Sequence, residues 1–272
     1  MPEDDQVSFE GLAPVTDVSV GAWIGPRLCG FGGRVCCIVP AGFAAYARIL
    51  HPAADERGGS ASWARVCEVT GRIAHPLMQW HTISTTTRAE AQTGVSSWPG
   101  SDPEVGNLAP AVLAGVLEIL AGFTVDPTDC YDAVWDGWGW QPGGLATLVA
   151  YHESDRSPAG PPPQLPPALP EEVLAGPRLR HPGRDYLLFH GPLRAALNIG
   201  HQAAADWRLP QSPSLLWPAD RSWLLGTEVD FDSTLVGGST ELIDELLQAT
   251  QLEAWPVGVG DDLTINGDLV NQ

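Results

Sequence analysis

Three acidic residues alternate with apolar residues in the segment Thr227-Glu228-Val229-Asp230-Phe231-Asp232. Side chains alternate between the two faces of a strand, so an extended segment would place Glu228, Asp230 and Asp232 together on one face. Carboxylate ligands suit Mg²⁺ or Ca²⁺, and their mutual repulsion would raise the pKa of at least one of them. The pattern predicts a divalent-metal or acid–base site. Its alternative is the exposed face of an antiparallel sheet, balanced by arginines of a neighbouring strand.

Three arginines lie close together in the segment 178–184, in a chain that is otherwise dominated by acidic residues. Guanidinium groups donate paired hydrogen bonds to carboxylate and phosphate groups. The spacing therefore predicts an anion-binding site formed by Arg178, Arg180 and Arg184. The alternative is that these arginines pair with the protein's own carboxylates.

A tryptophan-rich motif, Trp135-Asp136-Gly137-Trp138-Gly139-Trp140, offers a third candidate. If the motif continues a strand, Trp138 and Trp140 share one face and the glycines leave their rings uncovered. Such an aromatic surface stacks on sugars, prolines or guanidiniums, and it could also clamp the chain's own segment 161–167. The alternative is core packing, because a chain with 11 tryptophans must bury most of them.

The cysteines and histidines carry no recognisable metal-binding or redox spacing. The five cysteines are Cys29, Cys36, Cys37, Cys67 and Cys130. Their odd number and apolar neighbours predict small buried side chains in a reducing compartment, with Cys29 the candidate for a reactive thiol. The seven histidines include no His-Glu-x-x-His motif. Apart from a divalent cation at the carboxylates, no cofactor is evident.

The composition excludes several classes of chemistry. All 14 basic residues are arginine, and the absence of lysine rules out Schiff-base catalysis, pyridoxal phosphate anchoring and a phosphate-loop lysine. The net charge of −19 argues against binding to a nucleic-acid backbone or an anionic membrane. The first residues lack a secretory signal, and the longest apolar stretch, 108–123, is too short to cross a bilayer. We expect a cytoplasmic protein.

Hydrophobic periodicity and capping residues predict both helices and strands. Strands are expected at 35–39, 129–135, 185–189, 222–231 and 252–257, and a strand or short helix at 43–51. Helices are expected at 60–70 with Gly71 as C-cap, at 110–121, at 193–199 closed by Gly200, and at 239–250 with Ser239 as N-cap.

These elements predict an α+β fold with mixed or antiparallel sheets and a few packed helices. A proline-rich stretch at 157–170 predicts that residues 154–170 separate an N-terminal part (1–153) from a C-terminal part (171–272), either as a linker between domains or as a strap across one core. Similar Gly-Pro-Arg-Leu segments begin at Gly25 and Gly176 and raise the hypothesis of a diverged duplication.

Three segments, 46–52, 183–189 and 217–223, resemble segments of a large group of uncharacterised actinobacterial proteins. The resemblance covers most of the chain. It implies a bacterial cytoplasmic setting and no particular activity, and it transfers no site residues.

Two functions fit these observations. The first is a non-enzymatic binding or regulatory protein, immunity-like, that engages a protein partner through its acidic surface or its tryptophans. The second is a metal-assisted hydrolase that uses the carboxylates of Glu228, Asp230 and Asp232 and an arginine to hold an anionic substrate.

Overall fold

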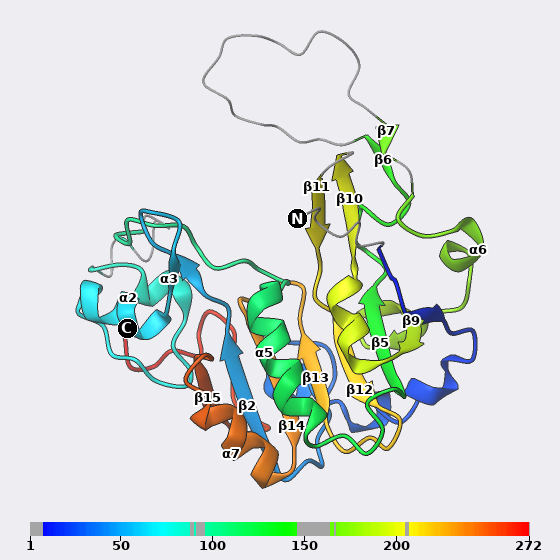
Figure 1. Ribbon diagram of the computed structural model, residues 1–272. Coiled ribbons are helices and arrows are strands. Elements are labelled where there is room, and N and C mark those ends of the chain that lie inside the picture. Colours follow the sequence, from blue (N-terminus) through cyan, green and yellow to red (C-terminus); the bar gives the residue numbers. More distant parts are fainter. Residues whose placement is uncertain are drawn as a thin grey trace, which may run out of the picture.

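The computed structural model describes residues 8–87, 90, 96–145, 164–165, 167–204 and 207–271. Its largest element is an antiparallel sheet with the strand order β1-β9-β5-β12-β13-β14-β2-β15, in which β8 also pairs with β9 (Figure 1). The strands are β1 (Ala13–Pro14), β2 (Ala45–Leu50), β5 (Cys130–Trp135), β8 (Leu179–His181), β9 (Arg184–Gly191), β12 (Leu215–Pro218), β13 (Leu224–Thr227), β14 (Ser233–Gly238) and β15 (Ala254–Val257). The α+β fold predicted from the sequence is confirmed.

The main sheet interleaves strands from the two sides of the proline-rich stretch. The early strand β5 pairs with β9 and β12, β2 pairs with β14 and β15, and β1 pairs with β9. The described residues of both parts therefore share one sheet. Most of the stretch 157–170 lies outside the described residues.

The hypothesis of a duplication is not confirmed. The segment that follows Gly25 forms a 3₁₀ turn, η2 (Gly25–Arg27), and then a short helix, α1 (Val35–Ile38). The corresponding segment after Gly176 instead forms the antiparallel hairpin of β8 and β9. The two local structures differ.

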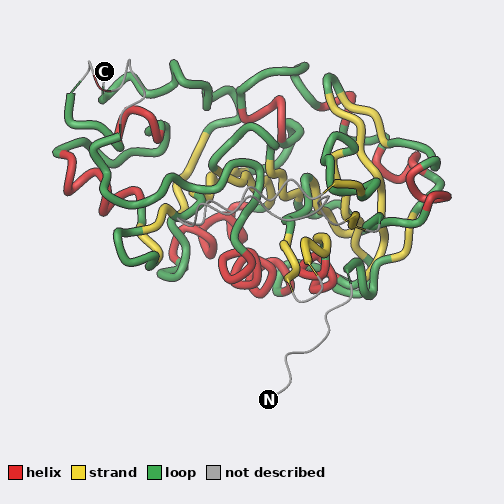
Figure 2. The backbone as a smooth tube through the Cα atoms, turned by 90° about the horizontal axis from the view of Figure 1, so that it is seen from above, coloured by secondary structure: helices red, strands yellow, loops and turns green. Residues whose placement is uncertain are grey.

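Helices cover one face of the sheet. They are α5 (Pro110–Ala121), α7 (Thr240–Gln248) and the 3₁₀ helix η3 (Leu193–Asn198). The stripe of Leu113, Val116, Leu117 and Leu120 on α5 is buried in this core together with Leu246 of α7. Figure 2 shows these helices on one side of the strands and mainly loops on the other.

The opposite face is covered largely by irregular segments. These are the loops around η1 (Val18–Gly21), η2 and α1, and the loop that follows β15. Ile24, Val39 and Leu263 from these segments pack with Trp217 and Leu224 of the sheet. Because short loops rather than long helices form this layer, side chains from distant parts of the chain meet here.

A smaller group of elements lies at the edge of the sheet formed by β2 and β15 (Figure 1). It contains α2 (Trp63–Thr70), α3 (Trp80–Ile83) and the hairpin of β3 (Ala53–Ala54) and β4 (Ser60–Ala61) around a buried Trp63. The remaining elements are α6 (Glu171–Leu174), the pair β10 (Gly200–Ala204) and β11 (Trp207–Pro210), and the pair β6 (Gly144–Leu145) and β7 (Gln164–Leu165). In the described part of the chain, no helix combines the length and apolar character needed to cross a lipid bilayer.

Three predicted helices are confirmed as α2, α5 and α7, and their caps explain why. The hydroxyl of Ser239 accepts a hydrogen bond from the backbone N–H of Leu242 at 3.2 Å, and Gly71 ends α2 in the left-handed conformation. The predicted helix at 193–199 is a 3₁₀ helix, and Gly200 begins strand β10 rather than capping it. The strands predicted at 129–135, 185–189 and 252–257 correspond to β5, β9 and β15, and the segment 43–51, predicted as a strand or a short helix, forms β2.

The strand predicted at 35–39 is wrong, because this segment forms the short helix α1. The N–H of Val39 donates to the carbonyl of Val35 at 2.9 Å and closes a helical turn. The N–H groups of Val35 and Cys36 donate to the carbonyls of Asp261 and Val259, which lie in the loop after β15. The apolar segment 35–39 is largely buried, as expected of a strand, but its backbone donates hydrogen bonds to a loop instead of a neighbouring strand.

Candidate functional site

The segment predicted to carry three aligned carboxylates is not a strand. Strand β13 ends at Thr227, and a turn connects it to β14, with the N–H of Phe231 donating to the carbonyl of Glu228 at 3.0 Å. The carboxylates therefore have different surroundings: the side chain of Glu228 is 14% exposed, that of Asp230 75% and that of Asp232 22%. The expectation of a shared strand face is corrected.

Arg184, the first residue of β9, holds this turn. Its guanidinium donates to Glu228 at 2.5 and 3.0 Å and to Asp230 at 2.6 Å. It also lies over the rings of Phe31 and Trp135, 5.0 and 5.3 Å from their centroids. Burial alone would lower the pKa of Arg184, but the two carboxylates raise it above its ordinary value. Arg184 thus remains a cation and neutralises part of the acidic turn.

The third carboxylate, Asp232, faces a different arginine. Arg48 of β2 is 1% exposed, and its guanidinium lies 3.6 Å from the Asp232 carboxylate. The guanidinium also donates to the Ser233 hydroxyl at 3.0 Å and to the Met78 carbonyl at 2.8 Å. Burial lowers the pKa of Arg48 to about 10, and the Asp232 charge opposes this effect. Burial also raises the pKa of Asp232, against the opposing charge of Arg48.

Arginines therefore balance the acidic turn, as in the alternative drawn from the sequence, although the carboxylates lie on a turn rather than a sheet face. Two of the three carboxylates already share the guanidinium of Arg184. The role of Glu228, Asp230 and Asp232 as metal ligands stays a prediction, and their arrangement favours the arginine pairs.

The turn forms one wall of a cleft of about 450 Å³. Five segments meet there: the loop before α1, helix α3, the start of strand β9, the β13–β14 turn and the loop after β15. Its apolar lining includes Phe31, Trp80, Phe231, Leu263 and Ile265, and its polar lining includes Gln79, His81, Arg184 and the three carboxylates. Phe31 and Ile265 are 63% and 72% exposed. The cleft thus combines exposed apolar side chains with acidic groups.

Gly183, in the turn of the β8–β9 hairpin, leaves space for the ring of Phe31 at the edge of the cleft. Its φ of +73° suits the hairpin turn, and a Cβ at this position would lie 2.4 Å from the ring of Phe31. A side chain there would displace Phe31 from the guanidinium of the adjacent Arg184. The glycine therefore supports the contact between the ring and the cation.

The three arginines predicted to bind an anion do not form one site. Arg178 donates to Asp136 at 3.0 Å and to the carbonyls of Leu174 and Gly176, and Arg184 belongs to the turn described above. Arg180 is 81% exposed and lies 3.9 Å from Asp185. The alternative of pairing with internal carboxylates describes this segment better.

The tryptophan-rich motif turns away from the sheet instead of extending it. Strand β5 ends at Trp135, so Trp138 and Trp140 lie in the turn that follows. Trp138 meets Trp135 edge to face at 5.5 Å, and Trp140 stacks on His201 at 5.1 Å. Both are partly buried against a hydrophobic cluster that includes Phe189. Most of the segment 161–167, predicted as a partner for these rings, lies outside the described residues.

The prediction that all five cysteines are reduced is wrong. Cys29 and Cys36 form a disulfide, and the thiol of Cys37 lies 3.2 Å from the sulfur of Cys29. Cys67 and Cys130 are buried free thiols, as predicted, and burial raises the pKa of each to about 12. The strand geometry that would have separated Cys36 from Cys37 is replaced by helix α1.

Sequence reasoning missed several residues of the cleft. Phe31, Trp80, His81 and Ile265 come from three segments that carry no common motif, and the pairing of distant strands and loops brings them together. Arg184 was identified, but not its pairing with Glu228 and Asp230. The signal available in the sequence was the opposite charge of the arginine-rich segment 178–184 and the acidic segment 227–232.

A comparison with family models, curated proteins and solved structures found no match to this chain.

Proposed function

We propose that this protein is a non-enzymatic binding or regulatory protein, which takes a basic, apolar segment of a partner protein into the cleft beside the β13–β14 turn. The observation that carries the proposal is the pairing, in one cleft, of exposed apolar side chains with carboxylates. Such a combination suits an extended peptide segment in which a large apolar residue lies next to arginine or lysine.

The apolar part of the proposal rests on Phe31 and Ile265. Both line the cleft and both expose more than half of their surface, so a partner that covers them would remove apolar area from water. Trp80 lies deeper, 9% exposed, and offers a wall against which an inserted side chain can pack. Aromatic side chains in such positions are frequent binding hot spots.

The electrostatic part rests on Asp230. Its side chain is 75% exposed, although one of its oxygens accepts a hydrogen bond from Arg184. A carboxylate has several acceptor positions, so a partner's guanidinium or ammonium can bind Asp230 from the solvent side. The net charge of −19 attracts basic partners over a longer range and raises the rate of encounter.

An immunity-like or regulatory role in the cytoplasm is the finer form of this proposal. An acidic protein that occupies the basic, functional surface of its partner would act in this way. The nucleic-acid backbone and anionic membranes are not partners in this proposal, because both repel an acidic surface.

The proposal is tested by measuring the binding of short fluorescent peptides by anisotropy. Peptides that combine leucine or phenylalanine with arginine should bind, whereas peptides with glutamate in place of arginine should not. The double substitution Phe31→Ser and Ile265→Ser should weaken binding at least about tenfold, because two exposed apolar contacts are lost.

Two substitutions serve as matched controls. Val125 is 87% exposed but does not line the cleft, so Val125→Ser should leave binding unchanged. Asp230→Asn should lower the affinity for the peptide and make that affinity less dependent on salt concentration. Asp244→Asn, on α7, should change neither quantity. Binding that is indifferent to the cleft substitutions, or that is equally strong for acidic peptides, would refute the proposal.

A further inference from the structure

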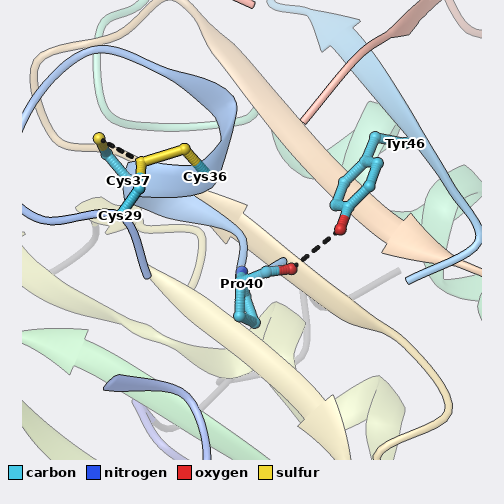
Figure 3. Close-up of a disulfide and its surroundings, with 5 residues drawn as sticks. All are labelled: Cys29, Cys36, Cys37, Pro40 and Tyr46. Carbon is cyan, nitrogen blue, oxygen red and sulfur yellow. Dashed lines mark hydrogen bonds between the residues drawn. A yellow bond between two sulfur atoms is a disulfide. The ribbon is translucent and has the colours of Figure 1, made fainter. Parts of the chain in front are cut away.

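Three cysteine sulfurs meet at the start of helix α1. Figure 3 shows the disulfide between Cys29 and Cys36 and, next to it, the free thiol of Cys37, 3.2 Å from the sulfur of Cys29. All three sulfurs lie within 4.8 Å of one another. Among the described histidines, cysteines, aspartates and glutamates, these three alone form a group of at least three with ligand atoms this close together.

Backbone hydrogen bonds, and not only the disulfide, bring the sulfurs together. The N–H of Cys29 donates to the carbonyl of Cys36 at 2.9 Å, and the N–H of Ala41 donates to the carbonyl of Arg27 at 2.9 Å. Further along the segment, the hydroxyl of Tyr46 donates to the carbonyl of Pro40 at 3.1 Å (Figure 3). Because peptide groups and a tyrosine hydroxyl make these bonds, and the sulfurs do not, we expect the bonds to keep the three side chains close when the disulfide is reduced.

The surroundings of Cys37 leave room for a small ligand. Its side chain lines a cavity of about 10 Å³, enough for one water-sized group, which is also lined by His181. The Nε2 atom of His181 is shielded from solvent and has no hydrogen-bond partner among the described residues. Cys29 is exposed, which gives reductants and ions access to the cluster from solvent.

The geometry points to a soft-metal site that the reduced chain forms from the thiolates of Cys29, Cys36 and Cys37, with Cu(I) as its ion. Soft sulfur ligands select Cu(I), Zn²⁺ and similar ions, and Cu(I) accepts three thiolates, whereas a structural Zn²⁺ site needs four ligands. In the disulfide form, two of the three sulfurs are bonded to each other and cannot bind the ion as thiolates, whereas reduction frees them. The site is independent of the cleft and of the function proposed for it.

The chemical steps balance with one external reductant. A dithiol transfers two electrons and two protons to the Cys29–Cys36 disulfide and leaves as its own disulfide, so the protein then carries three neighbouring thiols. Cu(I) binding replaces the three thiol protons, which pass to solvent. In a reducing compartment, where thiol systems keep cysteines reduced, the reduced form would predominate.

The experiment is an anaerobic transfer of Cu(I) from its coloured complex with bathocuproine disulfonate to the full-length protein. The protein reduced with a dithiol and freed of it should withdraw one equivalent of Cu(I), whereas the disulfide form should withdraw much less. Cu(I) should protect the three cysteines from alkylation, as read by mass spectrometry. A reduced protein that withdraws no Cu(I) would overturn the proposal.

Substitutions separate this site from other thiols. The variant Cys37→Ser keeps the disulfide and therefore the fold. After reduction, its affinity for Cu(I) should fall by more than about 10–100-fold, which is the usual cost of losing a residue that contacts a metal ligand rather than the metal itself. Cys67→Ala removes a thiol outside the cluster and should leave the affinity of the reduced protein for Cu(I) unchanged. An unchanged affinity in Cys37→Ser, or equal uptake by the disulfide form, would show that Cu(I) binds elsewhere. Peptide binding in the cleft is measured separately and does not affect this result.

Discussion

The clearest test of the structure concerns Asp132, which lies on β5, an interior strand of the main sheet. It occupies β5 opposite Phe189 of β9 and Leu216 of β12, and it is 0% exposed. Within the part of the chain that the structure describes, neither carboxylate oxygen has a hydrogen-bond partner. Burial raises the pKa of Asp132 well above its ordinary value of 3.8, so the folded protein holds this carboxyl protonated at a pH where the unfolded chain releases the proton.

The sign of the pH dependence follows from this difference. Above pH 3.8 the unfolded chain binds fewer protons at Asp132 than the folded protein does, so the free energy of unfolding falls as the pH rises. The loss is about 1.4 kcal/mol for each pH unit, until the pH reaches the pKa in the folded protein. Asp132→Asn abolishes the titration but keeps the shape and polarity of the side chain.

We therefore expect the stability of Asp132→Asn, relative to the native protein, to increase by about 1.4 kcal/mol per pH unit over this window. The assay is urea unfolding followed by tryptophan fluorescence at a series of pH values above 3.8. Asp244→Asn, at an exposed position on α7, is the control and should show no such trend. A stability difference for Asp132→Asn that stays constant with pH would refute the reasoning.

Three further predictions concern the remaining buried and capping groups. Glu253→Gln should lower the free energy of unfolding by about 1 kcal/mol in urea titrations, because its carboxylate accepts from the N–H groups of Trp63 and Ala64 at 2.5 and 2.7 Å. Burial lowers the pKa of His51 to about 4, so about 3 kcal/mol of stability should be lost as the pH falls from 6.5 to 4, a loss that His51→Gln should remove in pH-dependent unfolding. Ser239→Ala should cost about 1 kcal/mol in thermal or urea unfolding, because α7 loses its N-cap.

Local patterns predicted the helices well and the arrangement of the sheet poorly. The apolar stripe of α5 and the Ser239 cap of α7 are properties of short stretches of sequence, and both are found in the structure. Strand neighbours such as β2 and β14 are separated by most of the chain, and no local signal specifies that pairing. The α+β class could be predicted, but the strand order could not.

The candidate site was predicted only in part, for a specific reason. The turn after Thr227 contains no glycine or proline, and its alternation of acidic and apolar residues matches a strand. The pairing with Arg184 and the exposed Phe31 depend on contacts between remote segments. The Cys29–Cys36 disulfide likewise has a spacing that no sequence motif identifies.

The interleaved strand order has a consequence for synthesis of the chain. β2 is made well before both of its neighbours, β14 and β15, are translated. β5 is likewise translated before the two strands that pair with it, β9 and β12. During translation, β2 and β5 therefore keep unpaired backbone N–H and C=O groups along their edges until the strands that pair with them have been made, and such exposed edges favour association with other chains.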